Sequence, residues 1–234
     1  MTELIFDGKN LAEFCDYIYP INTNASPERV YDEYEIAGRN GKLLIDKKYY
    51  RNVPWAYRVI ITENPKERYD ELIAFFGHTS GYKILEDSDD EDKFMIAKIS
   101  TVTTPIYTTD QKALKFSISF DRQPQRFLIS GQVKQTVTSG DILSNPTLEE
   151  ARPLIRVYGN GTVTVNGTVI TVAGNTEQYI DIDCEEMECH YEETSLNNLV
   201  SFSTHEFPTL SVGDNEITFS DITALEITPR WWTI

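Results

Sequence analysis

The stretch LIRVYGNGTVTVNGTVITV, from Leu154 to Val172, contains two runs rich in β-branched residues around the dipeptide Asn166-Gly167. Asparagine and glycine tolerate positive φ angles, and a two-residue turn with such angles matches the twist of two antiparallel strands. The stretch therefore predicts a β-hairpin. Turns at intervals of roughly ten residues separate further strand-like runs, namely QYIDID (178–183), EITF (216–219) and ALEITPRWW (224–232). This pattern is typical of an antiparallel β-sandwich that needs no helix.

A segment without sheet periodicity precedes this sandwich. SGDILSNPTLEEARP (139–153) contains one glycine, two prolines and several polar residues, a composition typical of a connection between domains. We therefore expect an N-terminal domain at 1–140 and a C-terminal sandwich domain at 141–234.

The N-terminal half is predicted to be rich in short strands. In EIAGRNGKLLID (35–46), Gly38 and Gly41 supply residues that tolerate positive φ, so a turn is expected there. LKFSISF (114–120) alternates between apolar and polar residues, which indicates a half-buried strand. Its apolar side carries Leu114, Phe116, Ile118 and Phe120.

One helix is predicted at about 65–77. Asn64 can cap it, Pro65 suits the first helical position, and Glu67 can reach back to the cap. Gly77 can end it. A single apolar stripe with helical spacing, which should lie against a sheet, is formed by Tyr69, Leu72, Ile73 and Phe76. The predicted fold class is therefore mainly β, with one α-helix in the N-terminal half.

Composition narrows the possible functions. The chain has 234 residues, 37 acidic against 21 basic side chains and a formal net charge of −16, so a protein that reads nucleic acid is not expected. Three cysteines are too few for a disulfide framework and favour assembly in a reducing cytosol. We expect neither a signal peptide nor a membrane span, because no apolar run has the required length and flanks.

Two clusters have the residue types of metal sites but not the spacing. The acidic run from Asp87 to Asp92 lacks the glycine of a calcium loop, and Lys98 stands where its bidentate glutamate should be. A solvated hairpin tip is the simpler interpretation. Cys184, Cys189 and His190 lack the second pair of ligands that a zinc site needs. No metal is expected.

No catalytic or cofactor-binding residues are predicted. The sequence has no G-x-S-x-G motif and no glycine-rich phosphate loop, and 37 carboxylates make accidental acidic pairs inevitable. No residue pattern therefore supports the hypothesis of an uncharacterised hydrolase. The alternative function is a carbohydrate-binding β-sandwich module. Its sugar-stacking residues would be Tyr158, Tyr179, Tyr191, Trp231 and Trp232.

Several phrases, in order along the whole chain, resemble the distal tail proteins of long-tailed (siphovirus-type) phages of Gram-positive bacteria. Each phrase alone is weak, but their order and spacing together are specific. The phrases are YEIAGRNGKLLID (34–46), GYKILEDSDDEDKFMIAKI (81–99), FDRQPQRFLISG (120–131), NPTLEEARPLIRVYGNGTVTVNG (145–167), FPTLSVGDNEITF (207–219) and ITPRWW (227–232).

The resemblance implies a fold and a function. The fold is an N-terminal, split-barrel-like β domain with one helix, followed by a galectin-like antiparallel β-sandwich. The function is that of a non-enzymatic hub, in which six copies form a ring, or stacked rings, at the end of the tail tube. This hub joins the tube protein to the tail-tip or baseplate proteins and, in many phages, anchors receptor-binding proteins. Some relatives carry an inserted sugar-binding domain, for which a chain of 234 residues has no room.

The same resemblance implies a location in the virion tail tip, with assembly in the host bacterial cytoplasm. DNA would pass through the lumen of the ring without specific binding. The protein itself would have no membrane partner. A lumen lined by carboxylates would suit this passage, because each lysine or arginine on a phosphate adds salt-sensitive affinity.

Seven residues are predicted to lie at subunit or domain interfaces. Arg39 and Gly41 occupy a glycine turn, and Arg122 and Pro124 a proline turn, where an exposed arginine can pair with a carboxylate of the next copy. Local turn chemistry with solvated arginines is the open alternative. In the last strand, Trp231 is predicted to enter the sandwich core, with its neighbours Arg230 and Trp232 facing another domain or the ring.

Overall fold

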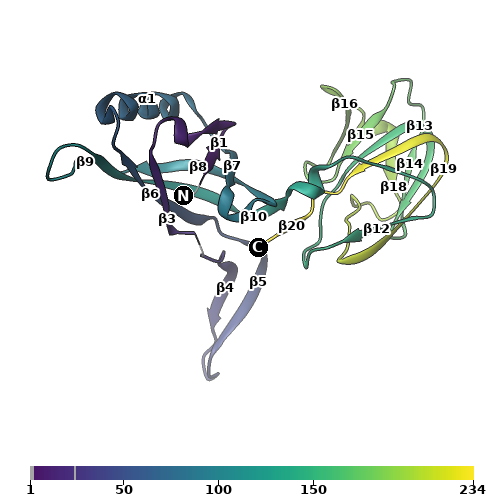
Figure 1. Ribbon diagram of the computed structural model, residues 1–234. Coiled ribbons are helices and arrows are strands. Elements are labelled where there is room, and N and C mark those ends of the chain that lie inside the picture. The colour runs from purple at the N-terminus through teal and green to yellow at the C-terminus, as the bar shows by residue number, and fades with distance from the viewer. Residues whose placement is uncertain (1–2, 24) are drawn as a thin grey trace. The chain divides into compact units, whose positions relative to one another are not determined.

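The computed structural model describes residues 3–23 and 25–234. The chain divides into two compact units, one formed by Met1–Arg126 with Ile234 and the other by Phe127–Thr233. Both are built mainly of antiparallel strands (Figure 1), and the expected mainly β fold class is confirmed. No helix in the described part of the chain is long and apolar enough to cross a membrane.

The N-terminal unit is built on one sheet. Its strand order is β2–β1–β7–β8–β10–β6–β3, and β9 and β20 also pair with β10. The bounds are β1 (Leu4–Phe6), β2 (Lys9–Asn10), β3 (Tyr17–Asn22), β6 (Val53–Ile61), β7 (Lys83–Asp87), β8 (Lys93–Val102), β9 (Ile106–Tyr107), β10 (Leu114–Leu128) and β20 (Trp232–Thr233). Alternate residues of β10 enter the core as predicted, and all four are at most 4% exposed: Leu114, Phe116, Ile118 and Phe120.

Helix α1 (Pro65–His78) packs on the core face of this sheet. Tyr69 meets Phe116 edge-on, with ring centroids 5.1 Å apart. The predicted stripe is partly wrong, because Ile73 is 37% exposed while Phe75 packs against the core instead. Asn64 has the left-handed conformation (φ 44°) and makes no side-chain capping bond, so the predicted cap does not form.

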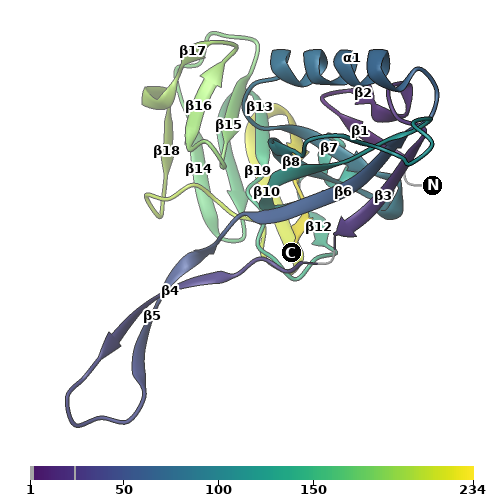
Figure 2. The same ribbon diagram turned by 90° about the vertical axis from the view of Figure 1, so that its left-hand side faces the viewer.

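A two-stranded arm belongs to the same unit. Its strands, β4 (Arg29–Glu35) and β5 (Lys42–Tyr50), pair only with each other. Figures 1 and 2 show the arm standing apart from the nine-stranded sheet. The arm leaves the sheet after β3 and returns at the start of β6.

The C-terminal unit is built on a second sheet with the order β11–β19–β13–β15–β16–β17. β12 also pairs with β19, and β14 pairs with both β13 and β18. The bounds are β11 (Gln135–Val137), β12 (Asp141–Asn145), β13 (Leu154–Val165), β14 (Thr168–Val172), β15 (Ile180–Asp183), β16 (Glu188–Tyr191), β17 (Thr194–Ser195), β18 (Val200–Phe202) and β19 (Gly213–Thr228). Four short 3-10 helices lie in the described part of the chain: η1 (Leu11–Glu13), η2 (Ser88–Asp90), η3 (Ile129–Gln132) and η4 (Asn197–Leu199).

The predicted hairpin is confirmed as β13–β14. Asn166 and Gly167 have φ angles of 47° and 83°, and Val165 pairs directly with Thr168. Farther down β13, the register with β19 shifts at Gly161, where an added Cβ would lie 2.3 Å from the Ser220 carbonyl oxygen. Only glycine therefore allows the two longest strands of the unit to approach this closely.

The two units divide earlier than the sequence predicted. The expected boundary lay between 140 and 141, whereas the structure divides the chain between Arg126 and Phe127. The segment taken for a connection contains β12, which pairs with β19 from Asp141 to Asn145. This strand lacks apolar periodicity because it flanks the sheet and has one largely exposed apolar residue, Ile142.

Candidate assembly surfaces

The arm exposes apolar side chains on both of its faces. All residues of β5 except the last are exposed, and Leu44 and Tyr49 reach 54% and 57%. The other large apolar residues exposed on the arm are Tyr31, Tyr34, Ile36, Leu43 and Ile45. An isolated two-stranded hairpin is only marginally stable in water, and a contiguous apolar surface of this kind marks a contact site.

Ion pairs hold the arm in register without a core. Arg29 donates from Nε and Nη2 to the Asp46 carboxylate, the Nη2 bond being 2.6 Å long. Hydrogen bonds from Arg29 hold the pKa of Asp46 below its usual range. Two more pairs bridge the strands, Lys42 with Glu33 and Lys47 with Asp32, each at 2.5 Å. Exposed pairs of this kind contribute little to stability because solvent screens them, so they set the register and leave the apolar surface uncovered.

Arg39 and Gly41 lie in the turn at the tip of the arm. Gly41 has a φ of 82°, as a turn glycine should. Arg39 is exposed and lines a shallow hollow with Glu35, Ile36 and Lys42. It has no ion pair among the described residues.

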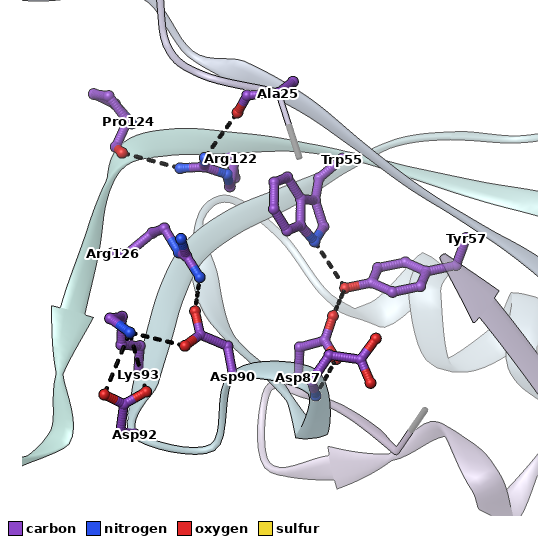
Figure 3. Close-up of polar contacts among 11 residues, drawn as sticks. Ala25, Trp55, Tyr57, Asp87, Asp90, Asp92, Lys93, Arg122, Pro124 and Arg126 are labelled. Carbon is purple, nitrogen blue, oxygen red and sulfur yellow. Dashed lines mark hydrogen bonds and ion pairs between the residues drawn. The ribbon is translucent and has the colours of Figure 1, made fainter. Parts of the chain in front are cut away.

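Arg122 is buried, so the expectation of an exposed arginine is wrong. Arg122 is only 1% exposed, and its guanidinium lies over the Trp55 ring, 4.6 Å from the centroid (Figure 3). Nη1 donates to the carbonyls of Gln123 and Pro124, both at 2.9 Å, and Nη2 to that of Ala25 at 3.4 Å. Burial lowers the pKa of Arg122 to about 10. Pro124 thus contributes its carbonyl oxygen to a contact inside the subunit.

A polar chain continues from Trp55 toward the acidic run (Figure 3). Trp55 Nε1 donates to the Tyr57 hydroxyl at 2.7 Å, and that hydroxyl donates to the Asp87 carboxylate. Burial, reinforced by Asp87, raises the pKa of Tyr57. Asp87 is itself 4% exposed.

The acidic run is therefore not a fully solvated tip. Asp90 forms ion pairs with Lys93, at 2.8 Å, and with Arg126. Buried polar groups need partners, and here the acidic side chains fasten the β7–β8 connection to the end of β10. Nowhere in the described chain do three or more of the usual ligand side chains form a group that could hold a metal ion.

The two tryptophans at the end of the chain pack against the core of the C-terminal unit, although the short strand β20, which contains Trp232, pairs with β10. Trp231 is 4% exposed, belongs to the core, and accepts a hydrogen bond at its carbonyl from the Leu128 N–H at 2.9 Å. A Cβ added to Gly131 would lie 2.4 Å from the Trp231 nitrogen. Trp232 packs against the same core and donates from Nε1 to the Glu150 carbonyl at 2.8 Å.

Arg230 also has its partner inside the C-terminal unit. Its two terminal nitrogens donate to the two Asp183 oxygens at 2.7 and 2.8 Å, a bidentate pair. Burial opposes ionisation of Asp183, but Arg230 and backbone N–H groups hold the pKa of Asp183 below its usual range. A role of Arg230 or Trp232 at a subunit interface stays a prediction.

Three of the proposed sugar-stacking residues do come together. Tyr179 lies 6.0 Å from Tyr158 and 4.8 Å from Tyr191, between ring centroids. The guanidinium of Arg156 lies over the Tyr179 ring at 3.8 Å and forms a bidentate pair with Asp181. These rings and charges are engaged with one another, and Trp231 is buried, so the arrangement resembles a packed sheet surface more than an open stacking platform.

The three cysteines are all buried and free. Burial raises the pKa of Cys15 and of Cys189 to about 12, and it raises the pKa of Cys184 as well. A thiol must ionise to act as a nucleophile, so none of them is poised for catalysis.

The structure is similar over its full length to the crystal structure of SPP1 Dit (gp 19.1) protein, described as a paradigm of the hub adsorption apparatus in phages that infect Gram-positive bacteria. The TM-score is 0.74, with 11% identity and complete coverage of both chains. It is also similar to the phage P2 baseplate in its activated conformation, with Ca (TM-score 0.53) and with Sr (TM-score 0.55), each at 9% identity and 97% coverage of both chains.

No protein-family profile and no curated protein sequence matches the chain. The chain therefore has the fold of phage hub and baseplate proteins, in agreement with the resemblance that its sequence phrases indicate. 

The arm is the surface that sequence reasoning did not recognise. The sequence predicts the turn at 38–41, but its pattern does not show that the strands on either side stand apart from the sheet. A usable signal lies in LLIDKKYY (43–50), which mixes apolar and charged residues without alternation. A strand with one buried face would alternate.

Proposed function

We propose that this chain is a structural hub of a phage tail, in which six copies close into a ring at the far end of the tail tube. The ring would join the tube protein to the tail-tip or baseplate proteins and anchor components that recognise the host. The observation that carries the proposal is the arm, whose apolar side chains find no cover in their own subunit. The likeness in fold to phage hub proteins supports it.

Closure of a ring sets a physical requirement that the N-terminal unit meets. A contact repeated head to tail closes only if each copy is rotated by a fixed angle, which demands a stiff subunit. The unit has one continuous core with α1 packed on the sheet, and the hydrogen bonds of Arg122 and the ion pairs of Asp90 link neighbouring segments.

The interface residues divide into three groups under this proposal. Arg39 and Gly41, at the tip of the arm, are placed to reach the next copy. Arg122 and Pro124 act indirectly, because they brace the end of β10. Arg230, Trp231 and Trp232 hold the C-terminal unit together, and a contact of Arg230 or Trp232 with a partner is an additional part of the proposal.

The proposed function involves no chemical reaction. The hub would be assembled in the bacterial cytoplasm and would work in the virion, with DNA passing through its lumen without specific binding. A formal charge of −16 on each copy supports such passage, because a strongly acidic ring repels the phosphates of DNA.

Two measurements test this function. Immunogold labelling of intact tails should place the chain at the end of the tube, and light scattering coupled to size exclusion should give a mass near six subunits. Tails that assemble and infect without this polypeptide would refute the proposal.

A further inference from the structure

Three asparagines of the chain are followed directly by glycine: Asn40, Asn160 and Asn166. In such a pair, the backbone nitrogen of the glycine can attack the carbonyl carbon of the asparagine side chain, because glycine has no Cβ that would block the approach. This attack begins a deamidation that needs only water. Its rate depends on how freely the side chain and the glycine nitrogen can move toward each other.

Hydrogen bonds hold two of the three side chains. Asn166 Nδ2 donates to Asn215 Oδ1 and, at 3.4 Å, to the Thr209 carbonyl. Asn160 Oδ1 accepts from the Asn175 N–H at 2.7 Å, and its Nδ2 donates to the Asn175 carbonyl at 3.0 Å. An attack would have to break these bonds and turn the side chain toward the glycine nitrogen. Both asparagines are therefore protected.

Strand pairing also fixes the backbone at these two sites. Gly161 pairs with Val172, and Val165 pairs with Thr168 across the Asn166-Gly167 turn. Closure of a ring between the side chain and the next nitrogen requires the backbone at the asparagine to rotate. Such a rotation would open the β13–β14 ladder, which adds a second barrier to the reaction.

Asn40 has neither restraint. It is exposed in the turn between Glu35 and Lys42, which form the last pair of the arm. In the described part of the chain, the Asn40 side chain makes no hydrogen bond, and the Gly41 N–H donates none. An added Cβ on Gly41 would meet nothing within 4 Å. Figure 2 shows this turn at the end of the arm that lies away from the sheet.

The charge next to Asn40 favours the reaction. Arg39 is exposed and has no ion pair among the described residues. The attacking nitrogen must first lose its proton, and a nearby cation stabilises the negative charge that results. Uncharged residues, Gly159 and Val165, precede the other two asparagines.

Water alone balances the reaction. The Gly41 nitrogen, after losing its proton, forms a bond to the side-chain carbonyl carbon of Asn40, and the bond from that carbon to Nδ2 breaks. The side-chain nitrogen takes up protons and leaves as ammonia, and a five-membered succinimide ring remains. Water then opens the ring at one of its two carbonyls, which gives aspartate or isoaspartate. The net reaction exchanges ammonia for water without any change of oxidation state.

We propose that Asn40 is a site of spontaneous deamidation in the folded chain, whereas Asn160 and Asn166 are preserved by their hydrogen bonds. Arg39 is the only charged residue of the turn 36–41, so a new carboxylate takes the formal charge of this turn from +1 to zero. Isoaspartate also lengthens the backbone by one methylene between the paired Glu35 and Lys42. The modification thus marks the age of a chain at the tip of its arm. The inference goes beyond the proposed function and does not depend on it.

Peptide mapping of the full chain tests the site. The protein is incubated in mildly alkaline buffer, dilute enough that light scattering gives the mass of one subunit, and is then digested with a glutamate-specific protease at mildly acidic pH. Mass spectrometry locates each deamidation as a gain of one mass unit. Asn40 should react several-fold faster than Asn160 and Asn166, and chromatography should resolve its aspartate and isoaspartate products.

Unfolding and substitution supply the controls. In urea, the hydrogen bonds of Asn160 and Asn166 are lost, so the rates at the three sites should converge. During incubation of the folded chain, ion exchange should show a growing acidic species that elutes close to the Asn40→Asp chain. Asn40→Gln should lack this species, because glutamine would have to close a larger ring. Both substitutions change an exposed side chain and should keep the wild-type melting profile.

Three results would overturn the inference. One is a rate at Asn40 in the folded chain that is no higher than the rates at Asn160 and Asn166. Another is the same order of rates in urea as in buffer, which would show that the hydrogen bonds do not protect. The third is an acidic species that still forms in Asn40→Gln, because the new charge would then arise elsewhere. None of these results bears on the labelling of intact tails, so the hub function is decided separately.

Discussion

The chain contains two hairpins in which the strand register is fixed in different ways. In β13–β14, Ile170 is fully buried, and the Asn166-Gly167 turn joins two strands that both contribute to a core. In the arm, Ile45 is 48% exposed and three ion pairs take the place of a core. A buried face fixes register through the hydrophobic pattern, whereas surface ion pairs fix it at little gain in stability. The first hairpin serves folding, and the second is available for assembly.

The largest difference between the hairpins is expected when one isoleucine of each is truncated to alanine. Ile170→Ala should lower the free energy of unfolding of the C-terminal unit by about 2–5 kcal/mol, through lost burial and a cavity. Ile45→Ala should change the stability of the monomer by less than about 0.5 kcal/mol. Urea titration of each purified monomer, with hydrogen exchange of 154–172 to assign the change, measures the difference. Equal losses would mean that the arm is also part of a cooperative core.

The next largest effect is expected from the side chain that holds the turn of the β13–β14 hairpin, compared with the exposed turn of the arm. Asn215 is fully buried, its Oδ1 accepts from the Asn166 side chain and from Ser211 N–H at 2.7 Å, and its Nδ2 donates to the Leu143 carbonyl at 3.0 Å. Asn215→Ala should cost about 1–3 kcal/mol, because buried donors and acceptors lose their partner. Asn40→Ala, at the exposed tip of the arm, is the matched control. Faster exchange of amides near 166 and 211 would report the loss, and unchanged protection would count against it.

A smaller effect is expected from the turn glycines. Gly167 and Gly38 have nearly the same φ, 83° and 81°, and open space where a Cβ would stand. Alanine strains this left-handed conformation by about 1–2 kcal/mol at either site. Gly167→Ala should therefore lower the thermal midpoint of the C-terminal unit by a few degrees. Gly38→Ala should leave it unchanged, because the arm is not part of the unfolding core; a shift of equal size in calorimetry would contradict this.

The smallest effect concerns pH. The pKa of Asp183 is lowered in the folded chain, so its ionised form stabilises the C-terminal unit above the unfolded pKa, near 3.8. That contribution is lost as pH falls through the folded pKa. Between about pH 5 and pH 2 the wild type should therefore lose stability more steeply than Asp183→Asn. Asp214→Asn, at an exposed residue that forms no ion pair among the described residues, is the control and should leave the slope unchanged. Parallel slopes for wild type and Asp183→Asn would show that the Arg230 pair adds no net stability.

The elements that the sequence predicts well are those with one buried face. The β13–β14 hairpin, the strand around Phe116 and the helix from Pro65 each carry the period of their secondary structure, because burial selects it. The Asn64 cap failed because a backbone in the left-handed region directs the side chain away from the first turn. Ile73 has helical spacing but lies at the edge of the buried stripe.

The candidate surfaces were harder to predict because their determinants are not periodic. Arg122 stands in a proline-containing segment that looks exposed. The ring of Trp55 and the carbonyl of Ala25, both distant in sequence, enclose it together with the carbonyls of the next two residues. Arg39 is a candidate because glycines flank it, but nothing in one sequence shows that its turn ends an isolated arm. The domain boundary was placed too late because β12 is an edge strand with little apolar content.

The buried thiols have a consequence for the resistance of the protein to oxidation. Cys15, Cys184 and Cys189 are free, shielded and reluctant to ionise. Oxidation and disulfide exchange proceed through the thiolate. Exposure to air should therefore not produce scrambled cross-links between copies, which would suit the proposed role as a structural part that cannot be repaired or replaced.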